Sequence, residues 1–352
     1  MTRVLVSGRV LDRQVGGNTR YARTVYSGLR RHGIDYTIGR PAGSGSRLRP
    51  VSYAVWEGLI LPTSKLEQFD VLHYPVDTGA LVPSRIPVVA TIQGLATLHV
   101  DNVRSPAADL LWRTRVTRLA ELADRIITGS ESSAADIVTV APGSASKIVT
   151  IPHGIDHSKF SPERGPDDDA ELAAAGIDGP YFLYLGNLDP RKNIIELAKA
   201  AERVFEQTGI PLIVAGAAAW DSDEIVEVVQ NTKGVRYLGR VSEALLLPLL
   251  RNALAFCFPS KYEGFGFPVV EAMACGTPVI CSHEGSLREV AADAALIVEG
   301  LGREDIERSM LRVATEPGLA DELRAKGLRN AQRFQWEESI AAHANVLKET
   351  AR

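Results

Sequence analysis

The chain has 352 residues, more than one hydrophobic core usually serves, so its length favours two domains. A formal net charge of -4 at pH 7 supplies no broad basic field for a phosphate backbone, which excludes nucleic acid as an expected partner. The first residues lack a signal-peptide pattern and no apolar run approaches membrane-spanning length, so we expect a cytoplasmic chain.

The first half of the chain alternates short apolar runs with amphipathic stretches, the pattern of a parallel sheet covered by helices on both faces. The predicted strands are residues 4–7, 36–39, 71–74, 88–92, 125–128 and 148–151. A helix is expected over residues 18–31, directly after Gly16 and Gly17. This glycine pair would let the backbone approach a phosphate, although its spacing is not the dinucleotide fingerprint and fits a plain turn equally well.

Polar residues follow the next strands of this half. His73 and Asp77 come at and after the third strand, and Gln93 follows the fourth, with His99 a little further on. Since a doubly wound sheet carries its functional loops at the ends of its strands, all four are candidates for a binding cleft. An isolated histidine is more often structural. The segment 41–50, rich in Gly, Ser and Pro, is predicted to form a loop at the mouth of such a cleft.

A basic helix is expected between residues 104 and 125. Its arginines Arg113, Arg115 and Arg118 surround apolar residues at core spacing. Peripheral contact with an anionic membrane is one interpretation, but a solvated face that packs through its apolar side is the favoured one.

Residues 157–176 interrupt the apolar periodicity with prolines, glycines and three consecutive aspartates, which predicts a linker. We therefore expect domains at residues 1–160 and 161–335, with a last helix near 336–348 that packs back on the first domain. The second half repeats the strand and helix alternation. Its predicted strands are 182–185, 212–215, 235–238, 255–258, 279–281 and 296–298, and its helices are 193–207, 221–230, 242–251 and 268–274.

Two glutamates, Glu263 and Glu271, lie eight positions apart around the start of a predicted helix. The segment KYEGFGFPVVEAMA joins a strand to that helix, and Pro268 suits its first turn. A helix N-terminus offers free backbone N–H groups to a diphosphate, and carboxylates accept hydrogen bonds from sugar hydroxyls. A lone glutamate there would more often serve only the helix dipole.

Two adjacent cations, Arg191 and Lys192, precede another predicted helix in YFLYLGNLDPRKNI. Beside a helix start they would neutralise a diphosphate and stabilise it as a leaving group. The three cysteines, Cys257, Cys275 and Cys281, form neither a CxxC pair nor a metal set and are predicted to be buried free thiols.

These motifs together resemble the GT4-type family of retaining glycosyltransferases, whose E-x7-E signature matches Glu263 and Glu271. The resemblance covers nearly the whole chain. It implies the α/β GT-B fold, in which two Rossmann-like doubly wound domains face each other across a cleft. It also implies transfer of a sugar from a nucleotide-sugar donor to an acceptor hydroxyl.

By the same resemblance, Glu263 faces the donor sugar and Glu271 holds the ribose. The family's motifs imply further roles. Backbone groups of Phe265, Gly266 and Phe267 would contact hydroxyls of the donor sugar. The donor phosphates would be bound by Gly186, Asn187, Arg191 and Lys192, with the loop of Gly16 and Gly17 covering them. The nucleobase would be bound at Arg240 and Val241.

Two positions depart from the family pattern. Asn187 stands where many relatives have an arginine, so Arg191 would supply that charge. Gln93 stands where relatives commonly have a histidine at the reaction centre, and an amide can donate a hydrogen bond but cannot titrate.

We predict no cofactor and no metal, since no D-x-D-like acidic pair is placed to hold a metal on the diphosphate. Three alternatives remain open: a phosphorylase or a nucleotide-sugar epimerase with the same fold, and a nucleotide-sugar binding protein without turnover. A dinucleotide-dependent oxidoreductase is remote because the G-x-G-x-x-G fingerprint is missing.

Overall fold

The computed structural model describes residues 1–12, 16–41, 49–100, 105–219 and 222–351. Internal contacts divide the chain into two units, which are described separately below. The first unit comprises Met1–Gly154 and Gln335–Arg352, and the second comprises Ile155–Phe334. The boundaries thus fall at 154/155 and 334/335, where the sequence predicted 160/161 and 335/336.

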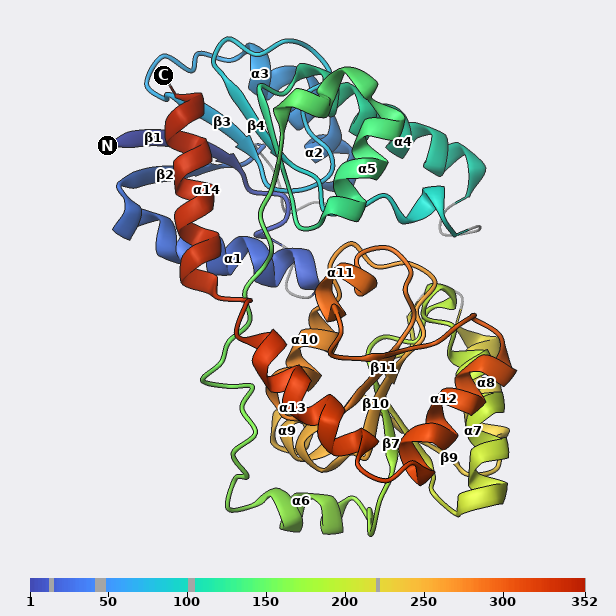
Figure 1. Ribbon diagram of the computed structural model, residues 1–352. Coiled ribbons are helices and arrows are strands. Elements are labelled where there is room, and N and C mark those ends of the chain that lie inside the picture. Colours follow the sequence, from blue (N-terminus) through green and yellow to red (C-terminus); the bar gives the residue numbers. More distant parts are fainter. Residues whose placement is uncertain (13–15, 42–48, 101–104, 220–221, 352) are drawn as a thin grey trace. The chain divides into compact units, whose positions relative to one another are not determined.

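The first unit contains a parallel six-stranded sheet in the order β2-β1-β3-β4-β5-β6 (Figure 1). Its strands are β1 (Thr2–Ser7), β2 (Ile34–Gly39), β3 (Val71–Tyr74), β4 (Val88–Thr91), β5 (Arg125–Thr128) and β6 (Ile148–Thr150). All six predicted strands are present, with ends that differ by at most two residues.

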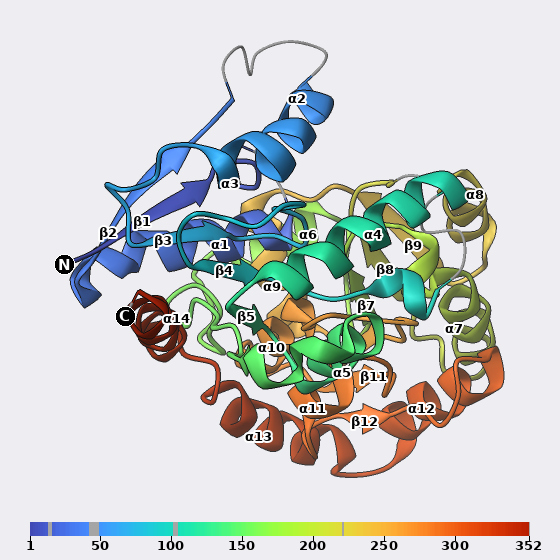
Figure 2. The same cartoon turned by 90° about the horizontal axis from the view of Figure 1, so that it is seen from above.

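Helices cover both faces of this sheet (Figure 2). On one face α1 (Gly17–Leu29) packs against α14 (Trp336–Thr350), so the last helix belongs to the first unit. The other face carries α2 (Arg49–Val55), a π-helix (Trp56–Ile60), α3 (Leu61–Thr63), α4 (Pro106–Leu122) and α5 (Glu131–Val140). This arrangement follows from right-handed crossovers between parallel strands. The loop predicted at 41–50 lies largely outside the described residues, and α2 begins at Arg49.

The second unit contains another parallel six-stranded sheet, in the order β12-β11-β10-β7-β8-β9. Its strands are β7 (Phe182–Leu185), β8 (Leu212–Ala215), β9 (Val235–Gly239), β10 (Ala255–Phe258), β11 (Val279–Cys281) and β12 (Leu296–Ile297). The central strand β10 is buried on both sides, which explains its continuous apolar run. The three cysteines are buried free thiols, as predicted.

Helices of the second unit also form two layers. α7 packs against α8 and α12, while α10 packs against α13 and α9 against α6. Their bounds are α6 (Asp168–Ala174), α7 (Ile194–Thr208), α8 (Asp223–Asn231), α9 (Glu243–Asn252), α10 (Phe267–Ala274), α11 (Leu287–Ala291), α12 (Arg303–Thr315) and α13 (Leu319–Ala331).

The segment predicted to be a linker is instead part of the second unit. It contains α6, and within the run of three aspartates Asp168 is buried. Arg251 donates from Nη1 to both carboxylate oxygens of Asp168, at 3.2 Å each. The prediction failed because an acidic run usually indicates a solvated segment. The partner of Asp168, Arg251, lies 83 positions away in the sequence, so nothing nearby indicated that this aspartate is buried.

Strand order marks one candidate ligand-binding edge in each unit. The order reverses between β1 and β3 in the first sheet and between β7 and β10 in the second. At such switch points the neighbouring crossovers leave on opposite faces, which opens a crevice outside the carboxyl ends of the strands. The two switch points are therefore the places where a ligand is expected.

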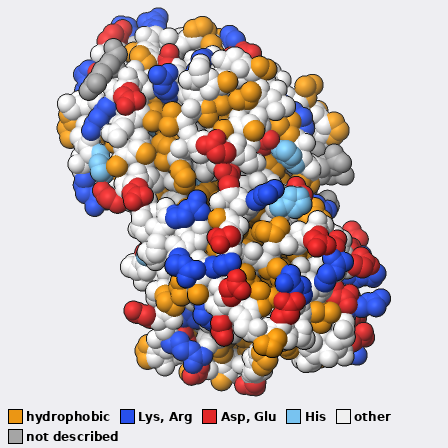
Figure 3. Space-filling model, in the orientation of Figure 1, with side chains coloured by type: hydrophobic (Ala, Val, Ile, Leu, Met, Phe, Trp, Pro, Cys, Tyr) orange, Lys and Arg blue, Asp and Glu red, His pale blue; other side chains and the backbone are white. Residues whose placement is uncertain are grey.

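The surface has no large region of one charge on the face shown in Figure 3, where cationic and anionic side chains are interspersed. No helix within the described residues is both long and apolar enough to cross a membrane.

Candidate functional site

The switch point of the second sheet brings together the loops after β7 and β10. After β7, Asp189 caps a 3-10 helix (Pro190–Lys192), because its Oδ1 accepts a hydrogen bond from the Arg191 N–H at 3.1 Å. The Arg191 carbonyl in turn accepts from the Lys261 N–H at 2.8 Å. These two bonds fix the adjacent cations beside the loop that carries Glu263.

Glu263 is the centre of this cluster. Lys192 Nζ donates to its Oε1 at 2.5 Å and Ser260 Oγ donates to the same oxygen at 2.6 Å. Arg191 Nη1 lies 3.4 Å from Oε2. Lys192 Nζ also lies 4.8 Å from the ring centroid of Phe258, the last residue of β10. Three residues that the sequence predicted separately therefore form one ion-pair network, in which Lys192 and Glu263 are buried.

The electrostatics of the network keep Glu263 ionised. Burial alone would raise the pKa of its carboxyl, but Lys192 and Arg191 outweigh burial and hold the pKa below its usual value. Burial lowers the pKa of Lys192, which Glu263 partly offsets. With Asp189 at 3.7 Å from Arg191, two cations face two carboxylates and the cluster is charge-balanced.

The segment after Glu263 is held by backbone contacts. Ser286 donates to the Glu263 carbonyl from both its N–H and its Oγ, each at 3.0 Å. A Cβ at Gly285 would meet the Glu263 carbonyl oxygen at 2.4 Å, so only glycine fits there. The position of the glutamate backbone is thus fixed by a neighbouring loop.

Helix α10 begins where the E-x7-E segment predicts it. Gly266 has φ 95° at the N-cap, a conformation that favours glycine. Phe265 is buried against Phe267 and Phe334, with ring centroids 5.1 and 5.6 Å away. The Phe265 side chain holds the loop in place, and the free backbone N–H groups at the N-terminus of α10 follow directly after it. Glu271 is also buried, on the second turn of α10.

The remaining predicted donor residues lie at the ends of β7 and β9. Tyr184 Oη donates to the Asn187 carbonyl at 2.9 Å, and a Cβ at Gly216 would meet the Gly186 carbonyl oxygen at 1.8 Å. The backbones after β7 and β8 therefore approach closely. Arg240, directly after β9, is exposed, and Val241 is half-buried.

In the first unit, Gln93 lies at the carboxyl end of β4 and is 9% exposed. Its N–H donates to Asp77 Oδ1 at 2.8 Å, and its carbonyl accepts from Ser133 Oγ at 3.2 Å. Its side-chain Oε1 pairs with His153 Nε2 at 2.8 Å. The amide Nε2 is buried and has no hydrogen-bond partner among the described residues. The Gln93 side-chain N–H group can therefore donate a hydrogen bond to a ligand.

His153 is a buried neutral histidine. Burial lowers its pKa to about 3, and its ring stacks near Trp336, with centroids 6.3 Å apart. Gly129 leaves room for the pair, since a Cβ there would meet His153 Nε2 at 2.9 Å. His153 and Gln93 are 60 positions apart in the sequence, so their contact comes from tertiary packing.

Of the other predicted site residues of the first unit, one histidine is buried, whereas a second histidine and the glycine pair are exposed. His73 is 1% exposed, and its ring nitrogens pair with Tyr26 Oη at 2.6 Å and Thr91 Oγ1 at 3.0 Å, which is a structural role inside the core. His99 is exposed and pairs with Asp136 at 2.7 Å. Gly16, with φ 108°, and Gly17 are exposed at the start of α1.

Two functional neighbours were missed from the sequence. Ser260 and Asp189 hold the cluster through side-chain hydrogen bonds to Glu263 and to the Arg191 backbone. Asp189 had a usable signal, since an aspartate before a proline is a common helix start. Ser260 had none beyond being polar at the end of an apolar strand.

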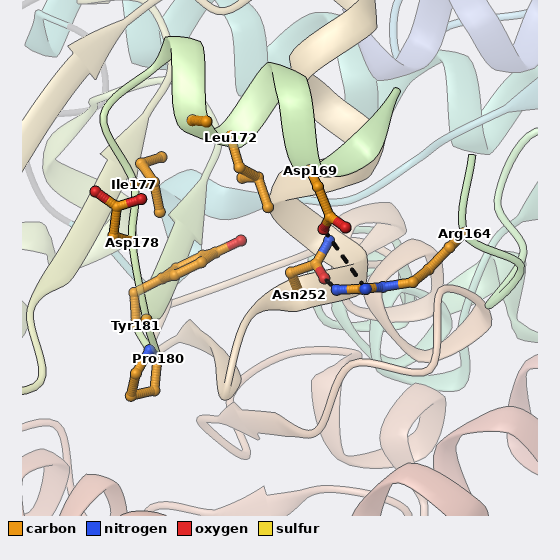
Figure 4. A pocket seen from close by; sticks show the side chains of 10 residues that line it. Arg164, Asp169, Leu172, Ile177, Asp178, Pro180, Tyr181 and Asn252 are labelled. Atoms are coloured by element: carbon orange, nitrogen blue, oxygen red, sulfur yellow. Dashed lines mark hydrogen bonds and ion pairs between the residues drawn. The ribbon is translucent and has the colours of Figure 1, made fainter. Parts of the chain in front are cut away.

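A cavity of about 410 Å³ lies at the other end of the second sheet (Figure 4). It is bordered by Tyr181, which precedes β7, and by Arg164, which is 3.5 Å from Asp169. This cavity is at the amino end of β7 and is thus separate from the switch point. Within the described residues, no group of three or more His, Cys, Asp or Glu side chains is placed to hold a metal ion.

Family models match both units. Residues 168–333 match the model described as Glycosyl transferases group 1, and residues 15–159 match Glycosyltransferase Family 4. The chain is 37% identical over 173 residues to the O-antigen chain mannosyltransferase B of Escherichia coli, a match that covers 48% of this chain and 45% of that protein. The chain thus spans less than half the length of this curated relative.

Solved structures match along almost the entire chain. Sucrose-phosphate synthase from Thermosynechococcus elongatus aligns with a TM-score of 0.77 at 21% identity, covering 99% of this chain and 98% of that one. HepE from Anabaena, solved in complex with UDP-glucose, aligns with a TM-score of 0.75 at 18% identity, covering 99% and 100%. With two doubly wound sheets and matches to both family models, the chain belongs to the GT4-type, group 1 glycosyltransferases and has their GT-B fold.

Proposed function

We propose that this protein is a retaining glycosyltransferase that moves a sugar from a nucleotide-sugar donor to an acceptor hydroxyl without a metal ion. The observation that carries the proposal is the cluster of Arg191, Lys192 and Glu263 at the switch point of the second sheet. It combines fixed cations with a carboxylate that is ionised at neutral pH. A donor with a diphosphate and a hydroxylated sugar needs this combination.

The cations would bind the donor diphosphate. The side chain of Arg191 is 25% exposed, whereas that of Lys192 is 10% exposed and lies against Phe258. Arg191 can therefore contact a phosphate directly, while Lys192 supplies fixed positive charge behind it. Charge that develops on the leaving diphosphate is stabilised by preorganised cations in a poorly hydrated site, which is the task a metal performs elsewhere. The N-terminus of α10 adds backbone N–H groups.

Glu263 serves as a hydrogen-bond acceptor for the sugar in this proposal. Its lowered pKa excludes a general-acid role at neutral pH. Because Lys192 and Ser260 already hold Oε1, the carboxylate is also a poor nucleophile. Retention then follows from same-face attack: the acceptor oxygen bonds to the anomeric carbon, the bond to the phosphate oxygen breaks, and the acceptor proton passes to the departing phosphate.

In the first unit, Gln93 is the proposed contact for the reacting groups. Its buried Nε2 is available to donate to a hydroxyl of the sugar or the acceptor. Relatives support the donor class: one aligned structure is a complex with UDP-glucose and one related protein is a mannosyltransferase. Asp77 and His99 are then candidates for the acceptor side, Asp77 through the bond that fixes the Gln93 backbone.

The proposal is tested first by donor binding. We expect one of UDP-glucose, GDP-mannose, ADP-glucose and dTDP-glucose to raise the melting temperature of the wild-type protein, because a ligand that binds only the folded state stabilises it. Glu263→Gln should reduce the shift. If no donor changes the melting temperature of the wild type, the donor site is assigned wrongly.

Turnover is tested with the donor that binds. Transfer to a panel of acceptor alcohols, followed by NMR of the anomeric proton in the product, should show the anomeric configuration of the donor. Activity should persist in excess EDTA. An inverted product would refute retention, and activity lost in EDTA but restored by Mg²⁺ or Mn²⁺ would refute metal independence.

A binding protein without turnover is the second candidate, and Gln93 in place of a titratable histidine is the observation that favours it. The two candidates differ in one result. A binding protein would show the thermal shift with a donor but neither transfer nor donor hydrolysis with any acceptor in the panel.

A further inference from the structure

A second charged cluster lies at the switch point of the first sheet. Arg9 follows β1 by two residues and Thr78 follows β3 by four, and Arg9 Nη1 donates to Thr78 Oγ1 at 2.8 Å. The bond joins the carboxyl ends of the two strands between which the strand order reverses. This is the position where a doubly wound sheet binds a ligand.

A buried carboxylate holds the cluster together. Glu57 is fully buried on the π-helix, an element that occurs often at functional sites. Its Oε1 accepts from Ser7 Oγ at 2.5 Å and its Oε2 accepts from Arg9 Nη1 at 3.1 Å. Tyr74 Oη donates to the Glu57 carbonyl at 3.0 Å. Side chain and backbone of Glu57 are thus both fixed.

Arg115 brings a second cation from α4. Its Nη2 lies 3.5 Å from Glu57 Oε2, the oxygen that Arg9 already uses. Two guanidinium groups therefore share one carboxylate, and within the described part of the chain no other ion-pair partner of either arginine is found. Arg115 is 8% exposed, yet its Nε and Nη2 have no hydrogen-bond partner among the described residues.

Such an arrangement is costly unless a ligand completes it. A buried donor left without a partner costs about 1–3 kcal/mol, and more when the group is charged. An ion pair that served only to join α4 to the π-helix would need one arginine. The second arginine, and its two nitrogens that lack a hydrogen bond within the described residues, are explained if an anion binds beside Arg9, Arg115 and the Thr78 hydroxyl.

We propose that Arg9 and Arg115 form a binding site for a phosphoryl group, and that the acceptor sugar or alcohol carries this group. The proposal rests on the proposed function for the word acceptor, since the donor diphosphate already has its own cations in the second unit. Two planar guanidinium groups and one hydroxyl suit the several oxygens of a phosphate. The site would select phosphorylated acceptors over neutral ones.

The test measures phosphate binding separately from donor binding. Titration of the full-length protein with methyl phosphate, followed by calorimetry, is compared for the wild type, Arg115→Met and Arg125→Met. Arg115→Met keeps the side-chain length, and Glu57 keeps Arg9 and Ser7 as partners. Arg125 is an exposed arginine at the amino end of β5, away from the switch point, and serves as the matched control.

We expect the wild type and Arg125→Met to bind methyl phosphate equally and Arg115→Met to bind it at least tenfold more weakly. Glucose 6-phosphate should compete with methyl phosphate, whereas glucose should not. If only vesicles that contain phosphatidic acid compete, the phosphoryl group belongs to a lipid acceptor. Should Arg115→Met fail to fold, Arg9→Met takes its place, with Arg115 left to balance Glu57.

The proposal is overturned if the wild type does not bind methyl phosphate, or if all three proteins bind it equally. Titration with UDP, GDP, ADP and dTDP on the same samples distinguishes the two hypotheses. If no nucleotide binds but methyl phosphate binds in an Arg115-dependent manner, the proposed donor site is refuted and the phosphoryl site is not. If a nucleotide binds but methyl phosphate does not, only the phosphoryl site is refuted.

Discussion

Lys192 and Glu263 form a buried pair, so the energetic effect of removing one charge differs from that of removing both. Lys192→Met would leave the Glu263 carboxylate with Ser260 and a more distant Arg191. Breaking a buried pair by removing one partner costs about 3–5 kcal/mol, and we expect about 3 kcal/mol because Arg191 remains. Urea unfolding measures this loss, and kcat should fall by about 100-fold or more.

The double variant Lys192→Met/Glu263→Gln is the control for this prediction. With both charges removed, no buried carboxylate lacks a cation, so much of the lost stability should return. Activity should not return, because both groups act on the donor in the proposed function. If the double variant regains stability and activity together, the pair has only a structural role.

Gly129 offers a test of the pair formed by Gln93 and His153. In Gly129→Ala the new methyl group would meet His153 Nε2 at 2.9 Å and Gln93 Oε1 at 3.5 Å. We expect the displaced amide to lower kcat about tenfold or more, in the range that positioning errors cause, with donor affinity unchanged. Gly143→Ala, where a Cβ meets nothing within 4 Å, should keep wild-type kinetics. A loss of donor affinity equal to the loss of kcat would contradict a positioning role.

Sequence could predict the residues of the proposed donor site but not their pairing. Glu263 and Lys192 stand in short segments whose neighbours reveal a helix start, so local patterns identify both. Their contact joins residues 71 positions apart. Glu57 was missed for the same reason: nothing around it marks a carboxylate that two distant arginines neutralise.

Among the elements, strands were predicted better than helices. All twelve strands were found, because a parallel strand buried on both faces, such as β10, is a short continuous apolar run. Helices α12 and α13 were missed, since they pack on the outer side of the second unit with a narrower apolar stripe and many charges. The linker was misplaced because α6 is short and acidic.

The contact between α1 and α14 depends on a glycine. A Cβ at Gly28 would meet Ile340 Cδ1 at 2.7 Å and Cγ2 at 2.9 Å. Gly28→Ala should therefore destabilise the first unit by about 1–3 kcal/mol through overpacking, which exceeds the gain of about 1 kcal/mol in helix propensity. Thermal unfolding followed by circular dichroism measures the change.

Ile340→Val removes the nearest methyl group, Cδ1, and provides the matched rescue. In the Gly28→Ala/Ile340→Val double variant, stability should exceed that of Gly28→Ala alone, although Ile340→Val by itself should lower it by about 1 kcal/mol. Additive losses would mean that the two helices can separate without cost and that Gly28 is not needed for their contact.

At the scale of the whole molecule, the two units should respond differently to acid. His73, His153 and His343, the three histidines that are fully buried, all belong to the first unit. Burial lowers their pKa values to about 3, 3 and 4. In the unfolded chain these histidines are protonated near pH 6.5, whereas in the folded unit they stay neutral to a much lower pH. Their contribution to the free energy of unfolding is therefore fully present above pH 6.5 and is lost as the pH falls. At pH 5 each histidine costs about 2 kcal/mol.

Glu263 sets a different limit for the second unit. Its lowered pKa means that its contribution is present above the usual carboxylate pKa and is lost only as the pH falls through a still lower value. The first unit should therefore unfold at a higher pH than the second. In a Trp220→Phe background the remaining tryptophans, Trp56, Trp112 and Trp336, report on the first unit alone. Their fluorescence should change between pH 6 and 4, before most of the far-ultraviolet dichroism is lost.

His343→Gln isolates the cause of this acid sensitivity. Glutamine stays neutral and can still reach Tyr21 Oη, which lies 2.5 Å from His343 Nε2, so the variant removes one of the three proton-binding sites while it keeps a hydrogen bond. Its fluorescence transition should move to lower pH. His157→Gln alters a half-buried histidine of the second unit and should leave that transition in place. If neither variant moves it and both units unfold together, the buried histidines do not govern the acid response, and charge repulsion over the whole surface becomes the better explanation.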